Sequence, residues 1–293
     1  MRIVVTGGSG LIGSWLVDRL VRRGDDVISV SKSVSPHQHG LSKPTSEVVG
    51  DLANLDLVKQ VMSGGVDAVV HLAANVAPAG VPARDLLISN ALSTLIVLEA
   101  AADEGIRVAV IASSISILGM AWAPNLIAPD FVPVDEGHPL RPTEGYALAK
   151  EFDEAIARMV ANRWGMTVIA LRFSYVGTEN MIEDRLQNSK NDVRLATVLA
   201  RELWGYLDVR DAAIAIDQAL LAAMSARVSG AVVLNVVADD VLSDEELPAL
   251  LARWFPSVAL TELRHRGAYD VTRARLKLGF EAVHLRKRFT LPR

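Results

Sequence analysis

The chain has 293 residues, of which 51% are hydrophobic and 22% are charged, and its formal net charge is −4 at pH 7. These proportions predict an ordered protein with a sizeable core, and the slightly acidic charge disfavours nucleic acid as a partner. The sequence contains no cysteine, which excludes disulfides, thiolate nucleophiles and cysteine-ligated metals and fits a reducing cytoplasm.

The N-terminal segment is apolar but is broken by glycines, so it lacks the pattern of a signal peptide. Apolar runs further along are too short or too often interrupted to cross a bilayer. We therefore expect a soluble cytoplasmic protein that does not contact the membrane.

Short apolar segments alternate with helical patterns through the first half of the chain. Strands are predicted at residues 2–6, 26–31, 47–52, 66–74, 108–114 and 166–173. Helices are predicted at residues 11–24, 55–63 and 85–105, and a further helix follows the Pro-rich stretch 115–143. This alternation is typical of βαβ units, which build a parallel sheet covered by helices on both faces. The predicted fold class is α/β, with a doubly wound parallel sheet.

The alternation weakens from Ser174 onward. Residues 178–195 are polar and are interpreted as irregular, whereas a helix at 208–226 and a strand at 230–238 resume the pattern. Ser243 and Glu246 have the spacing of a capping box for a helix that runs through Trp254. No separate core is apparent in this half. Two parts are therefore predicted: a main domain of residues 1–173, and a small C-terminal lobe within 174–293 from which residues 205–238 return to the main domain.

The segment TGGSGLIG, residues 6–13, lies where the first strand becomes the first helix. Gly7, Gly10 and Gly13 allow a tight turn, the close approach of a pyrophosphate to the backbone, and close packing of helix on strand. The helix N-terminus offers free N–H groups and the positive end of its dipole to the phosphates. The segment predicts a dinucleotide-binding turn, and a glycine-rich turn without a ligand is the alternative.

Several motifs in order are similar to those of one family. They are TGGSGLIG, Asp51-Leu52 after the third strand, HLAA at 71–74, Asn90, SSISILG at 113–119, YALAK at 146–150, LRF at 171–173 and GYLDVRDAA at 205–213. Together they resemble the extended short-chain dehydrogenases/reductases, also called the NAD-dependent epimerase/dehydratase family. The resemblance is strongest over residues 1–173, where it implies a Rossmann-type dinucleotide-binding domain, and it implies that the C-terminal lobe binds the substrate.

The resemblance also implies a set of cofactor contacts. The aspartate after the third strand hydrogen-bonds the adenine in that family, which indicates Asp51, and the HLAA backbone passes the ribose. The expected cofactor-binding residues are Gly7, Gly10, Leu11, Ile12, Gly13, Ser31, Lys32, Asp51, Leu52, Ala73, Ala74, Asn90, Tyr146 and Lys150. Asn90 is equally compatible with holding a helix in shape, and His71 is expected to pack in the core.

Tyr146 and Lys150 are one helical turn apart, so their side chains project from one face of the helix. A free tyrosine has a pKa of about 10, and a nearby ammonium lowers it by stabilising the phenolate. The resemblance implies that Tyr146 exchanges a proton with the substrate and that Lys150 binds the nicotinamide ribose. It also implies that Ser114, with Ser113 as its neighbour, hydrogen-bonds the same substrate oxygen.

The chain departs from the family pattern near the expected substrate. Ile115 and Ser116 stand where dehydratases usually carry an Asp-Glu pair, which disfavours dehydration. Tyr175 lies near the place of an asparagine that sugar-nucleotide epimerases usually have, and Leu118 replaces a tyrosine. These two departures argue against a nucleotide diphosphate sugar. Four basic residues either contact an anionic substrate or are solvated: Arg185, Lys190, Arg194 and Arg201.

Three further candidate residues lie in or beside the last motif of the series. Asp211 is expected to make a structural contact rather than to act in catalysis. Trp204 and Tyr206 either line the pocket or pack in the core.

The end of the second strand, VISVSKS, lacks the acidic residue that usually accepts hydrogen bonds from the 2′-hydroxyl of NAD. Ser31 takes its place, and Lys32 and Ser33 follow. Two hydroxyls and an ammonium can bind a 2′-phosphate. NADP is therefore slightly preferred over NAD as the predicted cofactor.

The sequence predicts an NAD(P)-dependent oxidoreductase that transfers a hydride between the nicotinamide and a carbonyl or alcohol of a small molecule, with Tyr146 as the acid and base. One alternative is a sugar or nucleotide-sugar epimerase that retains its cofactor. Another is a non-catalytic protein that senses the cofactor. No metal site is expected, and the resemblance implies a homodimer through the helices that carry Asn90 and Tyr146.

Overall fold

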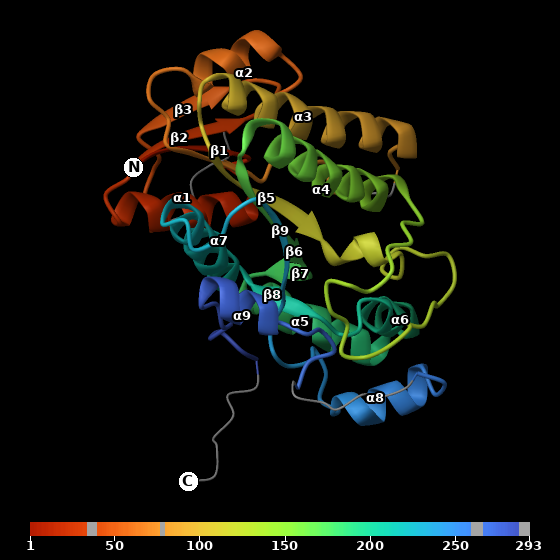
Figure 1. Cartoon of the computed structure of the whole chain (residues 1–293). Coiled ribbons are helices and arrows are strands. Elements are labelled where there is room, and N and C mark those ends of the chain that lie inside the picture. Colours follow the sequence, from red (N-terminus) through yellow and green to blue (C-terminus); the bar gives the residue numbers. More distant parts are fainter. Residues whose placement is uncertain (34–39, 77–79, 259–265, 287–293) are drawn as a thin grey trace.

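The computed structural model describes residues 1–33, 40–76, 80–258 and 266–286 (Figure 1). Seven parallel strands form one sheet in the order β3-β2-β1-β4-β5-β6-β9. Their bounds are β1 Arg2–Thr6, β2 Asp26–Ser31, β3 Ser46–Val49, β4 Ala68–His71, β5 Val108–Ser114, β6 Thr167–Phe173 and β9 Ala231–Val236. The strand order reverses between β1 and β4, which is where doubly wound sheets form a crevice for ligands. The predicted doubly wound α/β fold is confirmed.

Helices cover both faces of this sheet, as Figure 1 shows. One face carries α2 Leu55–Met62, α3 Ala83–Asp103 and α4 Gly145–Trp164, and the other carries α1 Leu11–Arg22, α7 Val209–Met224 and α9 Thr272–Leu278. Each layer buries its own apolar cluster against the sheet. Because the strands are covered on both sides, they are nearly continuous runs of Val, Ile and Ala.

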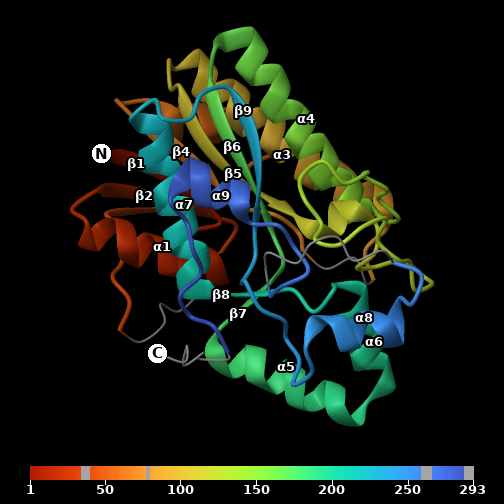
Figure 2. The ribbon, with the colours of Figure 1, turned by 60° about the horizontal axis from the view of Figure 1, so that its bottom comes forward.

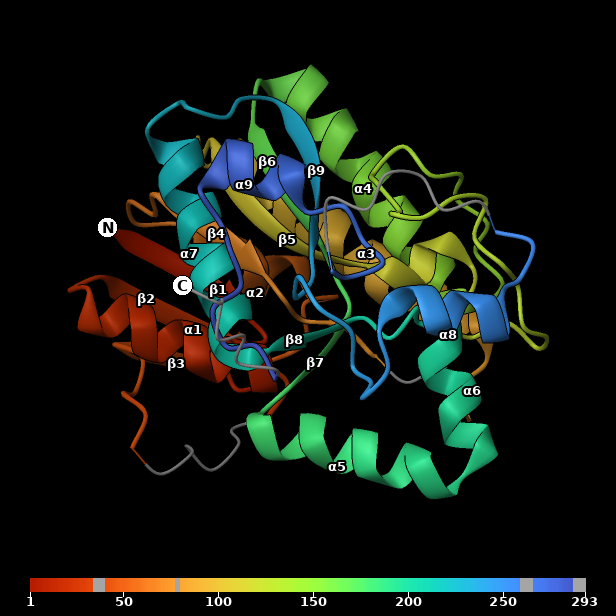
Figure 3. The ribbon, with the colours of Figure 1, turned by 90° about the horizontal axis from the view of Figure 1, so that it is seen from below.

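A smaller group of elements lies beyond one end of the sheet (Figures 2 and 3). It comprises α5 Glu179–Asn191, α6 Val193–Arg201, α8 Leu247–Trp254, and a two-stranded sheet of β7 Tyr175–Gly177 and β8 Tyr206–Asp208. A single-turn 3₁₀ helix, η1 Ile115–Leu118, packs against the same apolar cluster, whose largest fully buried side chains include Tyr206, Tyr269 and Ile117. The expectation that this half lacks a core of its own is therefore wrong in part: the small lobe has its own apolar cluster, to which residues 115–134 also contribute.

Two local predictions in this half are also wrong. Residues 178–195 are not irregular, because Thr178 caps α5 and the apolar side chains of Ile182 and Leu186 are buried along one side of that helix. Ser243 and Glu246 form no capping box, since the Ser243 hydroxyl instead accepts from the backbone N–H of Glu245. The helix begins at Leu247, because a proline fits the first helical turn, where its missing N–H costs nothing.

Two of the predicted strands are shorter in the structure. The strand expected over 66–74 ends at His71, and that expected over 47–52 ends at Val49. In both places the chain leaves the sheet and its next residues line a cavity. Among the described residues, α3 is the one helix long and apolar enough to cross a membrane, and half of its apolar stretch is buried inside the protein.

Candidate active site

A cavity of approximately 1020 Å³ opens where β1, β2, β4 and β5 end. Every residue that the sequence predicted for catalysis or cofactor binding lines it, from Gly7 in the first turn to Lys150 on α4. The residues come from seven separate segments of the chain. The parallel sheet brings them together because the carboxyl ends of its strands lie at one edge.

The glycine turn leaves room for a phosphate at the N-terminus of α1. Gly7 has a φ of 70°, and a Cβ on Gly13 would collide with the carbonyl oxygen of Gly7, so the fold itself requires both glycines. A Cβ on Gly10 would meet only that same oxygen, at 3.1 Å. Gly10 is the N-cap of α1 and brings no side chain to bond the first N–H groups of the helix. The turn therefore fits a dinucleotide pyrophosphate.

The far wall of this part of the cavity carries the residues expected near the adenosine. The Ser31 hydroxyl accepts from the N–H of Ser9 at 3.2 Å, and the Lys32 ammonium lies 3.2 Å from a carboxylate oxygen of Asp51. The N–H of Ala53 and then Lys32 hold the pKa of Asp51 below its usual value. Asp51 therefore compensates part of the charge of Lys32, and both side chains are exposed.

Polar side chains hold the end of β4 and the loop that follows it. The Asn90 side chain accepts from the N–H of Asn75 at 2.9 Å and donates to its carbonyl oxygen at 3.1 Å. His71 is 2% exposed and hydrogen-bonds the hydroxyls of Thr6 and Thr94, so the prediction that it packs in the core is confirmed. Burial, and then the nearby Lys150 ammonium, lower the pKa of His71 to about 3.

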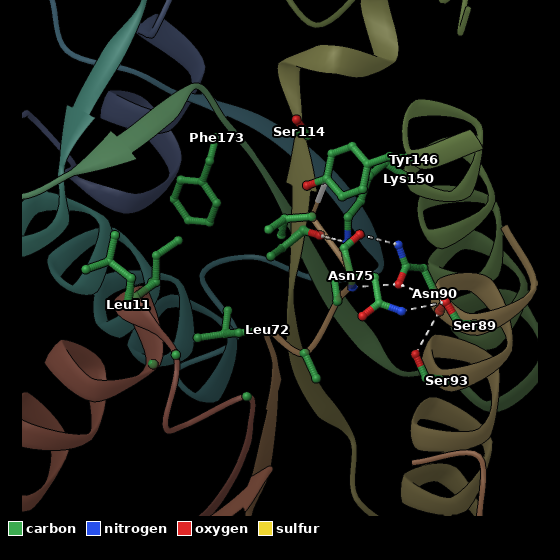
Figure 4. Close-up of a pocket in the computed structure, with 18 of the residues that line it drawn as sticks. Leu11, Leu72, Asn75, Ser89, Asn90, Ser93, Ser114, Tyr146, Lys150 and Phe173 are labelled. Carbon is green, nitrogen blue, oxygen red and sulfur yellow. Dashed lines mark hydrogen bonds between the residues drawn. The ribbon is translucent and has the colours of Figure 1, made fainter. Parts of the chain in front are cut away.

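Tyr146 and Lys150 lie on the first two turns of α4 and line the cavity, on the side opposite Leu11 of the glycine turn (Figure 4). The Glu144 carboxylate accepts from the N–H groups of Tyr146 and Ala147, both at 2.6 Å, and so fixes where the helix begins. The Lys150 ammonium lies 5.7 Å from the centre of the Tyr146 ring. It donates to the carbonyl oxygen of Ala112 at 2.8 Å.

The ammonium of Lys150 also bonds a buried carboxylate that the sequence interpretation did not single out. Asp153 lies 2.9 Å away and is 1% exposed. Burial alone would lower the pKa of Lys150, but Asp153, with Tyr146 and Glu154, outweighs it, and the pKa is raised. Lys150 is therefore held as a cation. Asp153 follows Lys150 by three residues on the same helix, a spacing that is visible in the sequence.

The two neighbouring serines at the end of β5 have different partners. Ser113 donates to Glu154 at 2.7 Å, and Glu154 in turn holds Arg172 at 2.8 and 2.9 Å in a buried ion pair. Within the described segments, the Ser114 oxygen accepts only from the N–H of Ser116, at 3.1 Å, and its hydroxyl can donate to a group in the cavity that it lines. An arginine within an apolar strand was the sequence signal for the buried pair.

Of the four basic residues in 185–201, only Arg185 lines the cavity. Lys190 pairs with Asp244 at 2.6 Å, and Arg194 is 92% exposed beside Asp192. Arg201 donates to the carbonyl oxygen of Pro124, outside the cavity wall.

The remaining three candidates are structural. Trp204 and Tyr206 are 3% and 0% exposed and pack in the cluster of the small lobe. Asp211 accepts from the N–H groups of Val283 and His284 and pairs with the His284 ring at 2.7 Å, as expected of a structural contact. The described residues contain no group of three or more His, Asp or Glu side chains that could hold a metal.

Comparisons with known proteins agree with this geometry. A model of the "NAD dependent epimerase/dehydratase family" matches residues 3–234. A UDP-glucose 4-epimerase of Streptococcus mutans is 30% identical over 178 residues, which cover 59% of this chain and 51% of that protein. An L-arabinose 1-dehydrogenase (NAD(P)(+)) of Haloferax volcanii is 30% identical over 209 residues, or 69% of this chain and 76% of that protein.

Solved structures extend the similarity to nearly the whole chain. A short-chain dehydrogenase/reductase superfamily protein from Agrobacterium tumefaciens with bound NAD has a TM-score of 0.70 at 25% identity, covering 97% of this chain and 93% of that one. A UDP-galactose 4-epimerase has a TM-score of 0.70 at 26% identity, covering 97% and 94%. The chain spans about half the length of the UDP-glucose 4-epimerases that it matches in sequence. On the family model and the shared fold, the chain belongs to the NAD dependent epimerase/dehydratase family.

Proposed function

We propose that this protein is an NAD(P)-dependent oxidoreductase that interconverts a carbonyl and an alcohol on a small substrate. The observation that carries the proposal is the meeting of Ser114, Tyr146 and Lys150 in the wall of the same cavity as the glycine turn. The bound nicotinamide would supply the hydride acceptor or donor. The protein supplies the placement of the substrate and a route for the proton.

Each of the three residues has one task in this proposal. The Tyr146 phenol takes the proton from the substrate alcohol, or returns it to the carbonyl oxygen. The Lys150 ammonium, fixed by Ala112 and Asp153, supports the phenolate and binds the nicotinamide ribose. The Ser114 hydroxyl donates a hydrogen bond to the same substrate oxygen.

The cofactor would lie along the residues of the glycine turn and the ends of β2 to β4. Related structures are described as binding NAD. We further propose that the protein prefers NADP to NAD. This preference rests on Ser31, Lys32 and Ser33, which stand at the end of β2 in place of a carboxylate. The contact of Lys32 with Asp51 limits how much of its charge a 2′-phosphate receives.

Replacement of Tyr146 by Phe tests the proposal directly. It removes the proton-transfer group and leaves the cofactor wall in place, so turnover should fall by about 10²- to 10⁴-fold. Cofactor titration should give nearly the wild-type dissociation constant. Full activity in the Tyr146→Phe variant would show that another group moves the proton.

The alternative enzyme is an epimerase, which oxidises and re-reduces one substrate with the cofactor retained. The epimerases among the relatives favour it. Purified protein that carries tightly bound cofactor and yields no net reduced nicotinamide would support epimerisation. A protein that binds cofactor without turning over any substrate would support the sensing alternative, although a sensor has no need of the Ser114, Tyr146 and Lys150 set.

Dehydration is not part of the proposal. Ile115 and Ser116 are 5% and 4% exposed in η1 and bring no carboxylate to the site. Mass analysis after incubation with nucleotide sugars should therefore find no loss of water.

We extend the proposal to the domain organisation, the oligomeric state and the location of the protein. Residues 1–173 would bind the cofactor, and residues 174–293 would mostly bind the substrate, with 205–238 returning to the sheet. A homodimer through α3 and α4 is supported by the exposed apolar side chain of Phe152 on α4, which lies outside the cavity wall. A molar mass from light scattering tests it. The cytoplasm is the proposed location.

A further inference from the structure

The substrate end of the cavity carries an ion pair stacked on an aromatic ring. Arg185 on α5 donates to a carboxylate oxygen of Glu202, at the end of α6, at 2.6 Å. The Arg185 guanidinium also lies 4.0 Å from the centre of the Tyr175 ring on β7. All three residues line the cavity that contains Tyr146. The ring and the carboxylate hold the guanidinium in one orientation, since a planar cation stacks and pairs at once.

This ion pair has unused hydrogen-bonding capacity. A guanidinium has five N–H donors, and in the described part of the chain only Nη2 of Arg185 has an acceptor. The side chain of Glu202 receives only this one bond from the described residues, through Oε2. A donor group and an acceptor group therefore stand side by side. A hydroxyl group both donates and accepts, so adjacent hydroxyls match this pattern.

At a separation of 2.6 Å, the Arg185 guanidinium and the Glu202 carboxylate compensate each other's charge. Burial raises the pKa of Glu202, against the opposing effect of Arg185. Among the described residues of the small lobe, the other basic side chains of α5 and α6 point elsewhere, as described above for Lys190, Arg194 and Arg201. The wall nearby adds the uncharged hydroxyls of Ser116 and Ser174, which have no hydrogen-bond partner among the described residues.

We propose that Arg185 and Glu202 recognise the hydroxyl groups of an uncharged polyhydroxylated substrate, a free sugar or polyol, beside Tyr146. This inference rests on the proposed oxidoreductase function and names its substrate class. A nucleotide diphosphate would bring at least two negative charges to this end, and burying them requires cations that are not already neutralised. A neutral polyol needs only paired donors and acceptors, which the Arg185–Glu202 pair and the serines provide.

The test measures production of reduced nicotinamide by the full-length protein with NAD(P)⁺. The panel contains neutral aldoses and alditols, the corresponding sugar acids, and UDP-glucose. Wild-type protein should turn over at least one neutral member with saturable kinetics. Glu202→Gln should raise its KM by about 10- to 100-fold, because a hydrogen bond to a charged group is lost, and should change kcat much less.

Two further variants keep the test decisive. Arg185→Gln should raise the KM for the same substrate. It replaces Glu202→Gln in the test if that variant shows no thermal unfolding transition and is therefore not folded. Arg194→Gln removes a neighbouring arginine outside the cavity and should change nothing. The dissociation constant of NAD(P)⁺ should stay the same in all three.

The outcomes separate the two proposals. Turnover of UDP-glucose or of sugar acids alone would overturn the neutral substrate class and leave the oxidoreductase function standing. Turnover of a neutral sugar with an unchanged KM in both cavity variants would overturn the role of Arg185 and Glu202. A protein that binds NAD(P)⁺ and turns over no member of the panel would overturn both proposals.

Discussion

Asp153 lies directly behind the lysine of the Tyr-Lys pair, on the next turn of α4. Its carboxylate and the Lys150 ammonium are 1% and 3% exposed, so each ion depends on the other for compensation. Asp153→Asn would leave a buried ammonium without a counter-ion, and breaking such a pair costs about 3–5 kcal/mol. We expect the free energy of unfolding, measured by urea denaturation, to fall by that amount.

A matched control comes from an exposed carboxylate of the same chain. Asp130 makes a two-pronged pair with Arg141, and both side chains are more than a third exposed. Asp130→Asn should change stability far less, since water and salt screen exposed pairs. Equal losses in the two variants would mean that burial of the Lys150–Asp153 pair does not set its importance.

Lys32 tests the cofactor preference at the scale of one side chain. Its ammonium is 63% exposed and lies 3.2 Å from Asp51. Lys32→Ala should weaken NADP binding by about 2- to 10-fold and leave NAD binding nearly unchanged, because a screened point charge contributes modestly. The measurement is the ratio of the two dissociation constants at fixed salt. Tighter binding of NAD than of NADP by wild-type protein, or an unchanged ratio in the variant, would refute the preference.

At the scale of elements, the loop after β4 depends on one side chain of α3. Asn90 bonds both backbone groups of Asn75, and residues 72–76 form part of the cavity wall. Asn90→Ala would leave these groups unpaired, at a cost of about 1–3 kcal/mol, and would loosen the wall against the cofactor. We expect a loss of stability together with an approximately tenfold weaker cofactor affinity.

Ser89→Ala is the control for this variant. The Ser89 hydroxyl contacts the Asn75 side chain at the exposed edge of the same loop and leaves the backbone of that residue alone. We expect Ser89→Ala to change neither the free energy of unfolding nor the cofactor affinity appreciably. If Ser89→Ala weakens cofactor binding as much as Asn90→Ala does, the loop is not held through its backbone.

The elements also show which parts of the structure a sequence can predict. The strands 26–31 and 108–114 match β2 and β5 to the residue, because each is a compact apolar run that closely follows a glycine, Gly24 or Gly105, at the end of the preceding helix. Helix α5 was missed because its buried side is short and the rest of it is polar, so that no long apolar pattern signals it. Such a helix is stabilised by tertiary packing and not by a local pattern that the sequence shows.

The residues of the site differ in the same way: some follow from local sequence motifs, and others depend on tertiary packing. Motifs and helical spacing placed Ser114, Tyr146 and Lys150 around one cavity, since each lies at the end of a strand or on the first turns of a helix. The pairing of Arg185 with Glu202 joins two helices of the small lobe and depends on how these pack. No local sequence pattern encodes that contact.

At the scale of the whole molecule, folding buries His71 in the centre of the sheet and keeps it neutral. Its native pKa is about 3, whereas that of the unfolded chain is about 6.5. Below pH 6.5 the unfolded state therefore binds a proton that the native state does not. Stability from this residue is complete above about pH 6.5 and falls as the pH is lowered toward 3, by up to about 1.4 kcal/mol per pH unit.

The variant His71→Gln isolates this contribution, because it keeps polar atoms near Thr6 and Thr94 and does not titrate. Glu136 and Glu202 act in the opposite direction: burial raises their pKa values, so their native forms hold protons more firmly and gain stability as the pH falls. Wild type and variant both contain Glu136 and Glu202, so the contributions of these two groups cancel in the difference between the two unfolding free energies. Urea denaturation from pH 7 to pH 4 should show that the advantage of wild type over His71→Gln shrinks steadily as the pH falls. A difference that does not vary with pH would mean that His71 is protonated in the native state, or is not buried in solution.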